Sequence, residues 1–102
     1  MASRVQLGPQ WLISNGSATS GPQEWKGGRG VFMSEHVGGV VSLEYLMPGG
    51  TNYAAAGADT TLAAPGGAGV FYLPPGTRVR AAVSGGATGA YAYCGEASDF
   101  IQ

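Results

Sequence analysis

The sequence predicts an all-β protein, a compact antiparallel β-sandwich of jelly-roll type with an N-terminal arm or hairpin. Nineteen glycines and six prolines interrupt the 102-residue chain so often that no stretch free of both exceeds eight residues. Helices in globular proteins average about 11 or 12 residues and strands about five or six, so this punctuation favours strands. Short strands separated by frequent turns are typical of a sandwich or barrel.

Alternating polarity supports the same fold class in three segments: 41–47, 77–83 and 90–94. In the second segment, Val79 and Ala81 point to one face of the expected strand while Arg78 and Arg80 point to the other. Successive side chains of a strand lie on opposite faces, so this pattern predicts strands with two different faces. In the third segment two tyrosines share one face and small residues share the other.

Weaker strand patterns fill most of the remaining chain. We expect these strands at 3–7, 10–14, 30–35, 59–63 and 69–73. Turn-forming pairs and triplets rich in asparagine, proline and glycine separate the strands, for example Asn15-Gly16, Pro48-Gly49-Gly50 and Gly85-Gly86.

The first 23 residues differ from the rest in being polar and rich in loop-forming residues. They predict an N-terminal arm or hairpin (1–23) in front of a β-sandwich domain (24–102). An isolated apolar patch, Trp11-Leu12-Ile13, lies within this arm, and we expect it to contact a partner instead of the core. The complete set of expected partner-contact residues is Trp11, Leu12, Ile13, Trp25 and Arg29.

A glycine-rich stretch at 24–39 raises the question of a phosphate-binding loop. Such a loop needs a lysine and a hydroxyl residue directly after its last glycine, whereas here Lys26 precedes the glycines. The dinucleotide-binding pattern also fails, because Gly28-Arg29-Gly30 continues as a strand. We therefore predict a turn in which Gly27 and Gly28 adopt positive φ and Gly30 allows close backbone approach.

Catalytic and metal sites are not expected from the residues present. The chain has one histidine, His36, and one cysteine, Cys94, too few for a structural zinc site and without a third group to complete a nucleophile–base pair. A lone histidine at a strand end is usually a surface or turn residue, so we expect this for His36. We expect Cys94 to behave as a small hydrophobic residue. No catalytic residue, metal ligand or cofactor is assigned, and we expect no enzymatic activity.

Charge and apolar runs restrict the partners that the sequence favours. A net charge of −1 with scattered basic residues lacks the clustered positive surface of nucleic-acid-binding proteins. No apolar run approaches the length of a membrane helix, no secretion signal is visible, and a single cysteine fits folding in a reducing cytoplasm. Charged residues make up only 11% of the chain, which favours either a permanent assembly or a neutral surface rich in glycine and alanine.

Ten percent of the chain is aromatic, which allows two interpretations. Exposed rings could form a sugar-binding platform, but aromatic residues on alternating strands are also what a β core requires. We expect most of them in the core.

Segments between residues 25 and 94 resemble small virion proteins of tailed bacteriophages, of the capsid decoration (cement) or related head and tail accessory type. The segments are WKGGRGVF, GGVVSLEY, DTTL, VFYLPPGTRVRAAVSGG and AYAY. The resemblance implies a β-sandwich that bridges coat subunits of its virion, with the major capsid protein as partner and a homotrimer as its assembled form. A tail or fibre component, or a carbohydrate-binding adhesion module, remains the alternative.

Overall fold

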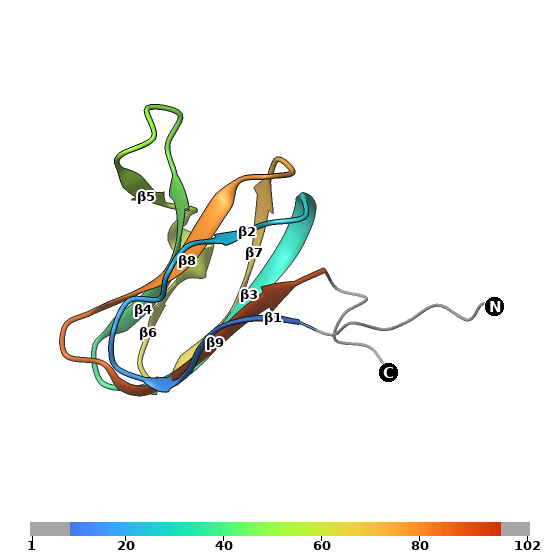
Figure 1. Ribbon diagram of the computed structural model, residues 1–102. Helices are drawn as coiled ribbons and strands as arrows, with labels where there is room; N and C mark the ends of the chain where they lie inside the picture. Colours follow the sequence, from blue (N-terminus) through green and yellow to red (C-terminus); the bar gives the residue numbers. More distant parts are fainter. Residues whose placement is uncertain (1–8, 97–102) are drawn as a thin grey trace.

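The structure, a computed structural model, describes residues 9–96 and consists of two antiparallel sheets packed face to face (Figure 1). The strands are Gln10–Gly16 (β1), Gln23–Glu24 (β2), Gly28–Val37 (β3), Val40–Leu46 (β4), Tyr53–Ala55 (β5), Thr61–Ala63 (β6), Gly66–Leu73 (β7), Arg78–Ser84 (β8) and Thr88–Gly95 (β9). One short 3₁₀ helix, Ala58–Thr60 (η1), precedes β6. The predicted all-β fold class is confirmed.

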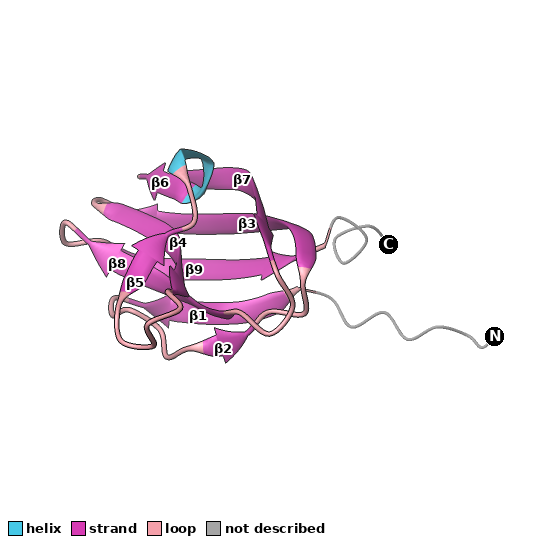
Figure 2. Cartoon of the chain, turned by 90° about the horizontal axis from the view of Figure 1, so that it is seen from above, coloured by secondary structure: helices cyan, strands magenta, loops and turns pink. Residues whose placement is uncertain are grey.

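The strand order identifies the sandwich as a jelly roll. One sheet has the order β1-β9-β3-β7, and the other has the order β2-β8-β4-β5, with β6 also paired to β4 (Figure 2). The first strand pairs with the last, β2 with β8, β3 with β7, and β4 with β5 and β6. These pairs are those of one long hairpin in which the first strands run beside the last. When this hairpin folds over into two sheets, β3 also pairs with β9 and β4 with β8, as in a jelly roll.

Most strands occur where the sequence pattern predicts them, usually longer by one to three residues at an end. The predicted strand at 3–7 lies outside the described residues. The segment predicted at 59–63 is a strand only from Thr61 onward, because η1 occupies its first part. The short strands β2 and β5 were not predicted, since two or three residues are too few to show an alternation.

The hydrophobic core lies between the sheets and contains the side chains that alternate inward along each strand. Its bulkiest fully buried members include Trp25, Phe32 and Leu43. The Trp25 ring packs against Phe71 with 4.9 Å between centroids, and its indole N–H donates to the Gly28 carbonyl at 3.3 Å. Trp25 is therefore a core residue, and its predicted role as a partner contact is wrong.

The glycine-rich stretch is a turn leading into β3, as predicted. Gly27 and Gly28 have φ of 110° and 86°, a region that disfavours residues with a Cβ. A Cβ at Gly30 would lie 2.6 Å from Phe71 and 2.7 Å from Trp25, so glycine lets β3 pass directly over these two rings. The chain continues from there as a ten-residue strand, which is unlike the helix that follows a nucleotide-binding loop.

The predicted N-terminal arm is wrong for residues 10–16, because β1 is an integral strand of the four-stranded sheet. Both Leu12 and Ile13 are buried in the core, although consecutive strand residues normally face opposite ways. The register of β1 against β9 shifts between Trp11 and Ile13, and this bulge turns two adjacent apolar side chains inward. A boundary at residue 23 also finds no support, since β2 spans it and pairs with β8.

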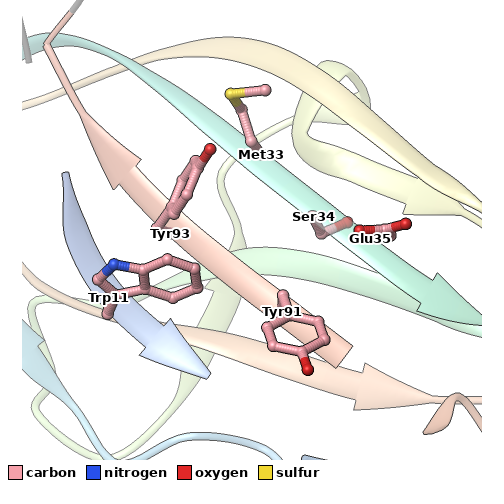
Figure 3. A pocket seen from close by; sticks show the side chains of 6 residues that line it. All are labelled: Trp11, Met33, Ser34, Glu35, Tyr91 and Tyr93. Atoms are coloured by element: carbon pink, nitrogen blue, oxygen red, sulfur yellow. The ribbon is translucent and has the colours of Figure 1, made fainter. Parts of the chain in front are cut away.

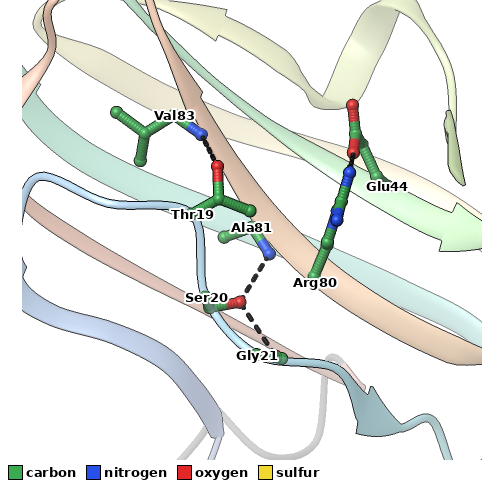
Figure 4. Close-up of polar contacts among 7 residues, drawn as sticks. All are labelled: Thr19, Ser20, Gly21, Glu44, Arg80, Ala81 and Val83. Carbon is green, nitrogen blue, oxygen red and sulfur yellow. Dashed lines mark hydrogen bonds and ion pairs between the residues drawn. The ribbon is translucent and has the colours of Figure 1, made fainter.

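The loop before β2 continues the pairing along the edge of β8 (Figure 4). The Ser20 backbone N–H donates to the Ala81 carbonyl at 3.0 Å, and the Ala81 N–H donates to the Ser20 hydroxyl at 2.9 Å. One step further, the Val83 N–H donates to the Thr19 hydroxyl at 3.0 Å. Hydroxyl side chains thus satisfy backbone donors of β8 that would otherwise form an open sheet edge.

Candidate functional site

The outer surface of the four-stranded sheet is apolar and aromatic, and we refer to it as the outer face. Six large hydrophobic residues are exposed in residues 9–96, and five of them lie on strands of this sheet. The relative solvent-accessible surface of these five residues ranges from 42% to 71%. They are Trp11 from β1, Val37 from β3, Val70 and Tyr72 from β7, and Tyr91 from β9. Several large apolar side chains exposed on one face favour an interaction site there.

Strand register aligns these side chains into rows across the sheet. Trp11 lies opposite Tyr93, and Tyr93 lies opposite Met33 on its other side. Each strand alternates, so the intervening residues of β9, Ala92 and Cys94, point into the core and are buried. The register therefore places the rings of Trp11 and Tyr93 side by side on β1 and β9, with Met33 of β3 next to them.

The opposite surface of the sandwich has a different character. There, Arg80 of β8 pairs with Glu44 of β4 at 2.8 Å between Nη2 and Oε1, and its Nε donates to the same oxygen at 2.9 Å (Figure 4). The Arg80 guanidinium also lies 3.9 Å from the centre of the Tyr53 ring. Glu44 and Arg80 thus satisfy each other on this surface, whereas the outer face exposes more large apolar side chains and is the better candidate for contact with a partner.

A pocket of about 330 Å³ opens on the outer face where β1, β9 and β3 lie side by side (Figure 3). Its lining residues are Trp11, Met33, Ser34, Glu35, Tyr91 and Tyr93. The Trp11 and Tyr93 rings meet edge to face, with centroids 4.6 Å apart and planes at 79°. Glu35 is exposed and is the only residue of the lining that carries a charge.

The five predicted partner-contact residues divide between the outer face and the core. Trp11 and the exposed Arg29 lie on strands of the outer face, Trp11 beside the pocket and Arg29 opposite Tyr72 in the β3–β7 register. The other three, Leu12, Ile13 and Trp25, are buried and cannot contact a partner in the folded protein. The sequence did not lead us to expect partner contacts at Tyr72, Val70 and Tyr91. Each alternates along its strand with small or apolar neighbours, and such alternation is the signal that indicates a strand with two different faces.

His36 is buried, and its predicted place on the surface or in a turn is wrong. It lies inside β3, where Phe32, Ser34 and His36 alternate toward the core. Its Nδ1 shares a 3.3 Å hydrogen bond with the Ser34 hydroxyl, while Nε2 has no hydrogen-bond partner in the described part of the chain. The strand β3 extends beyond residue 35, where the sequence pattern predicted its end. Its alternation therefore continues through His36, whose side chain points into the core.

Cys94 is fully buried, as expected for a small hydrophobic residue. It pairs with Phe32 in the β3–β9 register, four residues along β3 from His36, or roughly 13 Å at 3.3 Å per residue. The fold therefore does not bring the chain's histidine and cysteine together. Within residues 9–96, no three histidine, cysteine, aspartate or glutamate side chains gather in the manner of metal ligands.

Comparison with known proteins adds no relative: no family model matches the sequence, and no curated protein or solved structure matches the chain. In the described part of the chain, no helix has the length and apolar character that crossing a membrane requires. The functional argument consequently starts from the outer face and its pocket.

Proposed function

We propose that the protein is a non-enzymatic virion protein of a tailed bacteriophage that decorates the capsid and cements it by bridging coat subunits. The observation that carries the proposal is the one-sided outer face, where five large hydrophobic side chains are exposed on one sheet. Interface cores are poor in Lys, Glu and Asp and rich in aromatic residues, as this face is. The resemblance of segments within residues 25–94 to capsid decoration proteins supplies the coat protein as the partner.

The jelly-roll topology is compatible with this proposal and with its main alternative. Jelly rolls occur in viral capsid domains and in lectins, so the architecture by itself favours neither. The exposed rings of Trp11 and Tyr91 in the pocket lining are the observation that favours a carbohydrate-binding adhesion module. A lectin binds glycans as an isolated protein, whereas a cement protein binds only the assembled shell.

Shell stability tests the cement function directly. Removing the protein from virions that carry it should lower their resistance to heat or chelator, and adding it back should restore that resistance. A protein that binds the intact shell and not its disrupted form stabilises the shell by mass action, and a trimer with several contacts strengthens the effect. Stripped shells as robust as complete ones would exclude cementing and leave the adhesion alternative.

Changing the outer face should weaken binding to the shell. Val70→Glu places an unpaired carboxylate in the proposed contact and is expected to reduce affinity about 30-fold, since burying such a charge costs on the order of 2 kcal/mol or more. The matched control is Ser84→Glu, which adds one carboxylate at an exposed position on β8 of the other sheet. Co-sedimentation of both variants with stripped shells measures the difference, and equal binding would contradict the assignment of this face.

Binding through this face should also resist salt. The contact is proposed to be mainly apolar, and apolar burial does not weaken when the Debye length falls from about 8 Å to 3 Å between 0.15 M and 1 M salt. Dissociation of the protein from shells at 1 M salt would instead indicate an electrostatic contact. The same co-sedimentation assay, repeated over this range, decides between them.

A further inference from the structure

The pocket between β1, β9 and β3 has features that an apolar contact does not require. Its walls are aromatic rings from two strands, its floor is the backbone of β3 and β9, and a carboxylate stands at its edge (Figure 3). An extended apolar surface would be served equally well by aliphatic side chains. Three aromatic rings beside one negative charge suit a positively charged ligand that is planar or compact.

Ring geometry favours a cation over a sugar. The faces of aromatic rings carry negative electrostatic potential and attract cations placed over them. Because the Trp11 and Tyr93 planes stand at 79° to each other, these two rings face different directions and do not form one flat platform. A sugar chain stacks best along a coplanar surface, which two rings in edge-to-face contact do not provide, whereas a compact cation needs only one ring face.

The charge of Glu35 points to the same ligand class. Glu35 lies opposite Tyr91 in the β3–β9 register, so its carboxylate shares the edge of the pocket with that ring. It forms no ion pair with another described residue, in contrast to Glu44, which is held by Arg80. A carboxylate that becomes covered by a partner needs a cationic counterpart, because burying it alone is costly.

Among cationic groups, the guanidinium of arginine matches the pocket best. It is planar, stacks on aromatic rings and can pair with a carboxylate through two parallel N–H donors, which lysine cannot do. The pocket volume of about 330 Å³ is large enough to admit an arginine side chain. We propose that this pocket binds an arginine side chain carried by the partner protein.

The identity of the protein that carries this arginine rests on the proposed function, but the chemistry of the pocket does not. The pocket can be tested on the isolated full chain with Nα-acetyl-arginine amide, and the shell experiments are independent of that result. Binding of the amide without shell binding would reject the coat as partner and keep the pocket. Shell binding without amide binding would reject the pocket and keep the outer face.

NMR spectroscopy provides an internal control, because the chain contains two tryptophans. Titration with Nα-acetyl-arginine amide should shift the indole N–H signal of Trp11 saturably, with a dissociation constant of roughly 1 mM, typical of a weak single-group ligand. The signal of Trp25, buried in the core, should stay in place. Nα-acetyl-citrulline amide, a neutral ligand of nearly the same shape, should bind at least about fivefold more weakly.

One substitution tests the contribution of the charge, and a second tests the contribution of the ring. Glu35→Gln removes the negative charge, and Tyr91→Leu removes a ring face; each is expected to weaken arginine binding about three- to tenfold. Tyr72→Leu removes a more exposed ring from the same face outside the pocket lining and should leave the affinity unchanged. The dispersed Trp25 signal reports that each variant remains folded.

Three results would overturn the inference. Equal binding of the arginine and citrulline ligands would show that charge is not recognised. Saturable binding of methyl glycosides, with no response to arginine, would assign the pocket to a sugar and favour the adhesion alternative. Equal loss of arginine binding in Tyr72→Leu and Tyr91→Leu would show that the ligand binds across the outer face and not in the pocket.

Discussion

A chain that begins at residue 24 is expected to be unfolded. Such a chain lacks β1 and Gln23, one of the two residues of β2; these strands pair with β9 and β8 on different sheets of the sandwich. It also lacks Thr19 and Ser20, whose hydroxyls accept hydrogen bonds from the backbone of β8. The expectation follows from the position of these elements inside the jelly roll and differs from the sequence-based division into an N-terminal arm or hairpin (1–23) and a β-sandwich domain (24–102).

The energetic loss is comparable to the whole stability of a small domain. Leu12 and Ile13 are both buried in the core, and full burial of each such side chain contributes about 1.5–3 kcal/mol. The total free energy of unfolding of such domains is about 5–15 kcal/mol. Loss of the strand pairing lowers the stability of the truncated chain further. The exposed edge of β9 would in addition favour aggregation.

Circular dichroism and the dispersion of NMR signals measure this outcome against the full chain. Two point variants in the intact chain give a finer test: Ile13→Ala removes buried methyl groups and should cost about 2–4 kcal/mol. Ser14→Ala, at the exposed neighbouring position, should change stability by less than about 0.5 kcal/mol. A truncated chain that is folded and cooperative would mean that the N-terminal segment is an accessory arm.

Gly69→Ala is expected to destabilise the protein by about 3 kcal/mol. Gly69 lies in β7 directly beneath η1, and a Cβ at this position would collide with the backbone carbonyl of Asp59. Backbone cannot move aside as a flexible side chain can, and η1 is anchored through the buried Thr60, whose hydroxyl donates to the Gly57 carbonyl at 3.2 Å. The clash must therefore displace either η1 or the strand.

Chemical denaturation of the variant and of Gly67→Ala provides the measurement. Gly67 lies two residues away on the same strand, and a Cβ there would meet only Leu62, at an ordinary contact distance of 3.9 Å. Its substitution should change the free energy of unfolding by less than about 0.5 kcal/mol. Equal stability of the two variants would show that η1 does not press on β7.

The candidate site was only partly predictable. Trp11 and Arg29 were expected to contact a partner, and both lie on the outer face. The pattern at 90–94 correctly separates two tyrosines from small residues, but alternation does not say which set points inward. In the fold, the small residues Ala90 and Ala92 are buried because the large rings of Trp25 and Phe32 occupy the space between the sheets.

The fold class and most of the strands could be predicted from the sequence alone. Those properties depend on local causes: glycine and proline limit the length of each element, and alternating polarity defines two faces of a strand. The turn at Gly27 and Gly28 belongs to the same group, because positive φ is a preference of single residues.

Which face of each strand is buried, and which strands pair, depends on contacts between distant parts of the chain. A bulge places Leu12 and Ile13 together in the core, and pairing of the first strand with the last brings Trp11 beside Tyr93, 82 residues later in the chain. The burial of His36 and the pocket around Glu35 depend on the same long-range register. Local propensities carry no information on such pairings, since they are fixed by the packing of two complete sheets around one core.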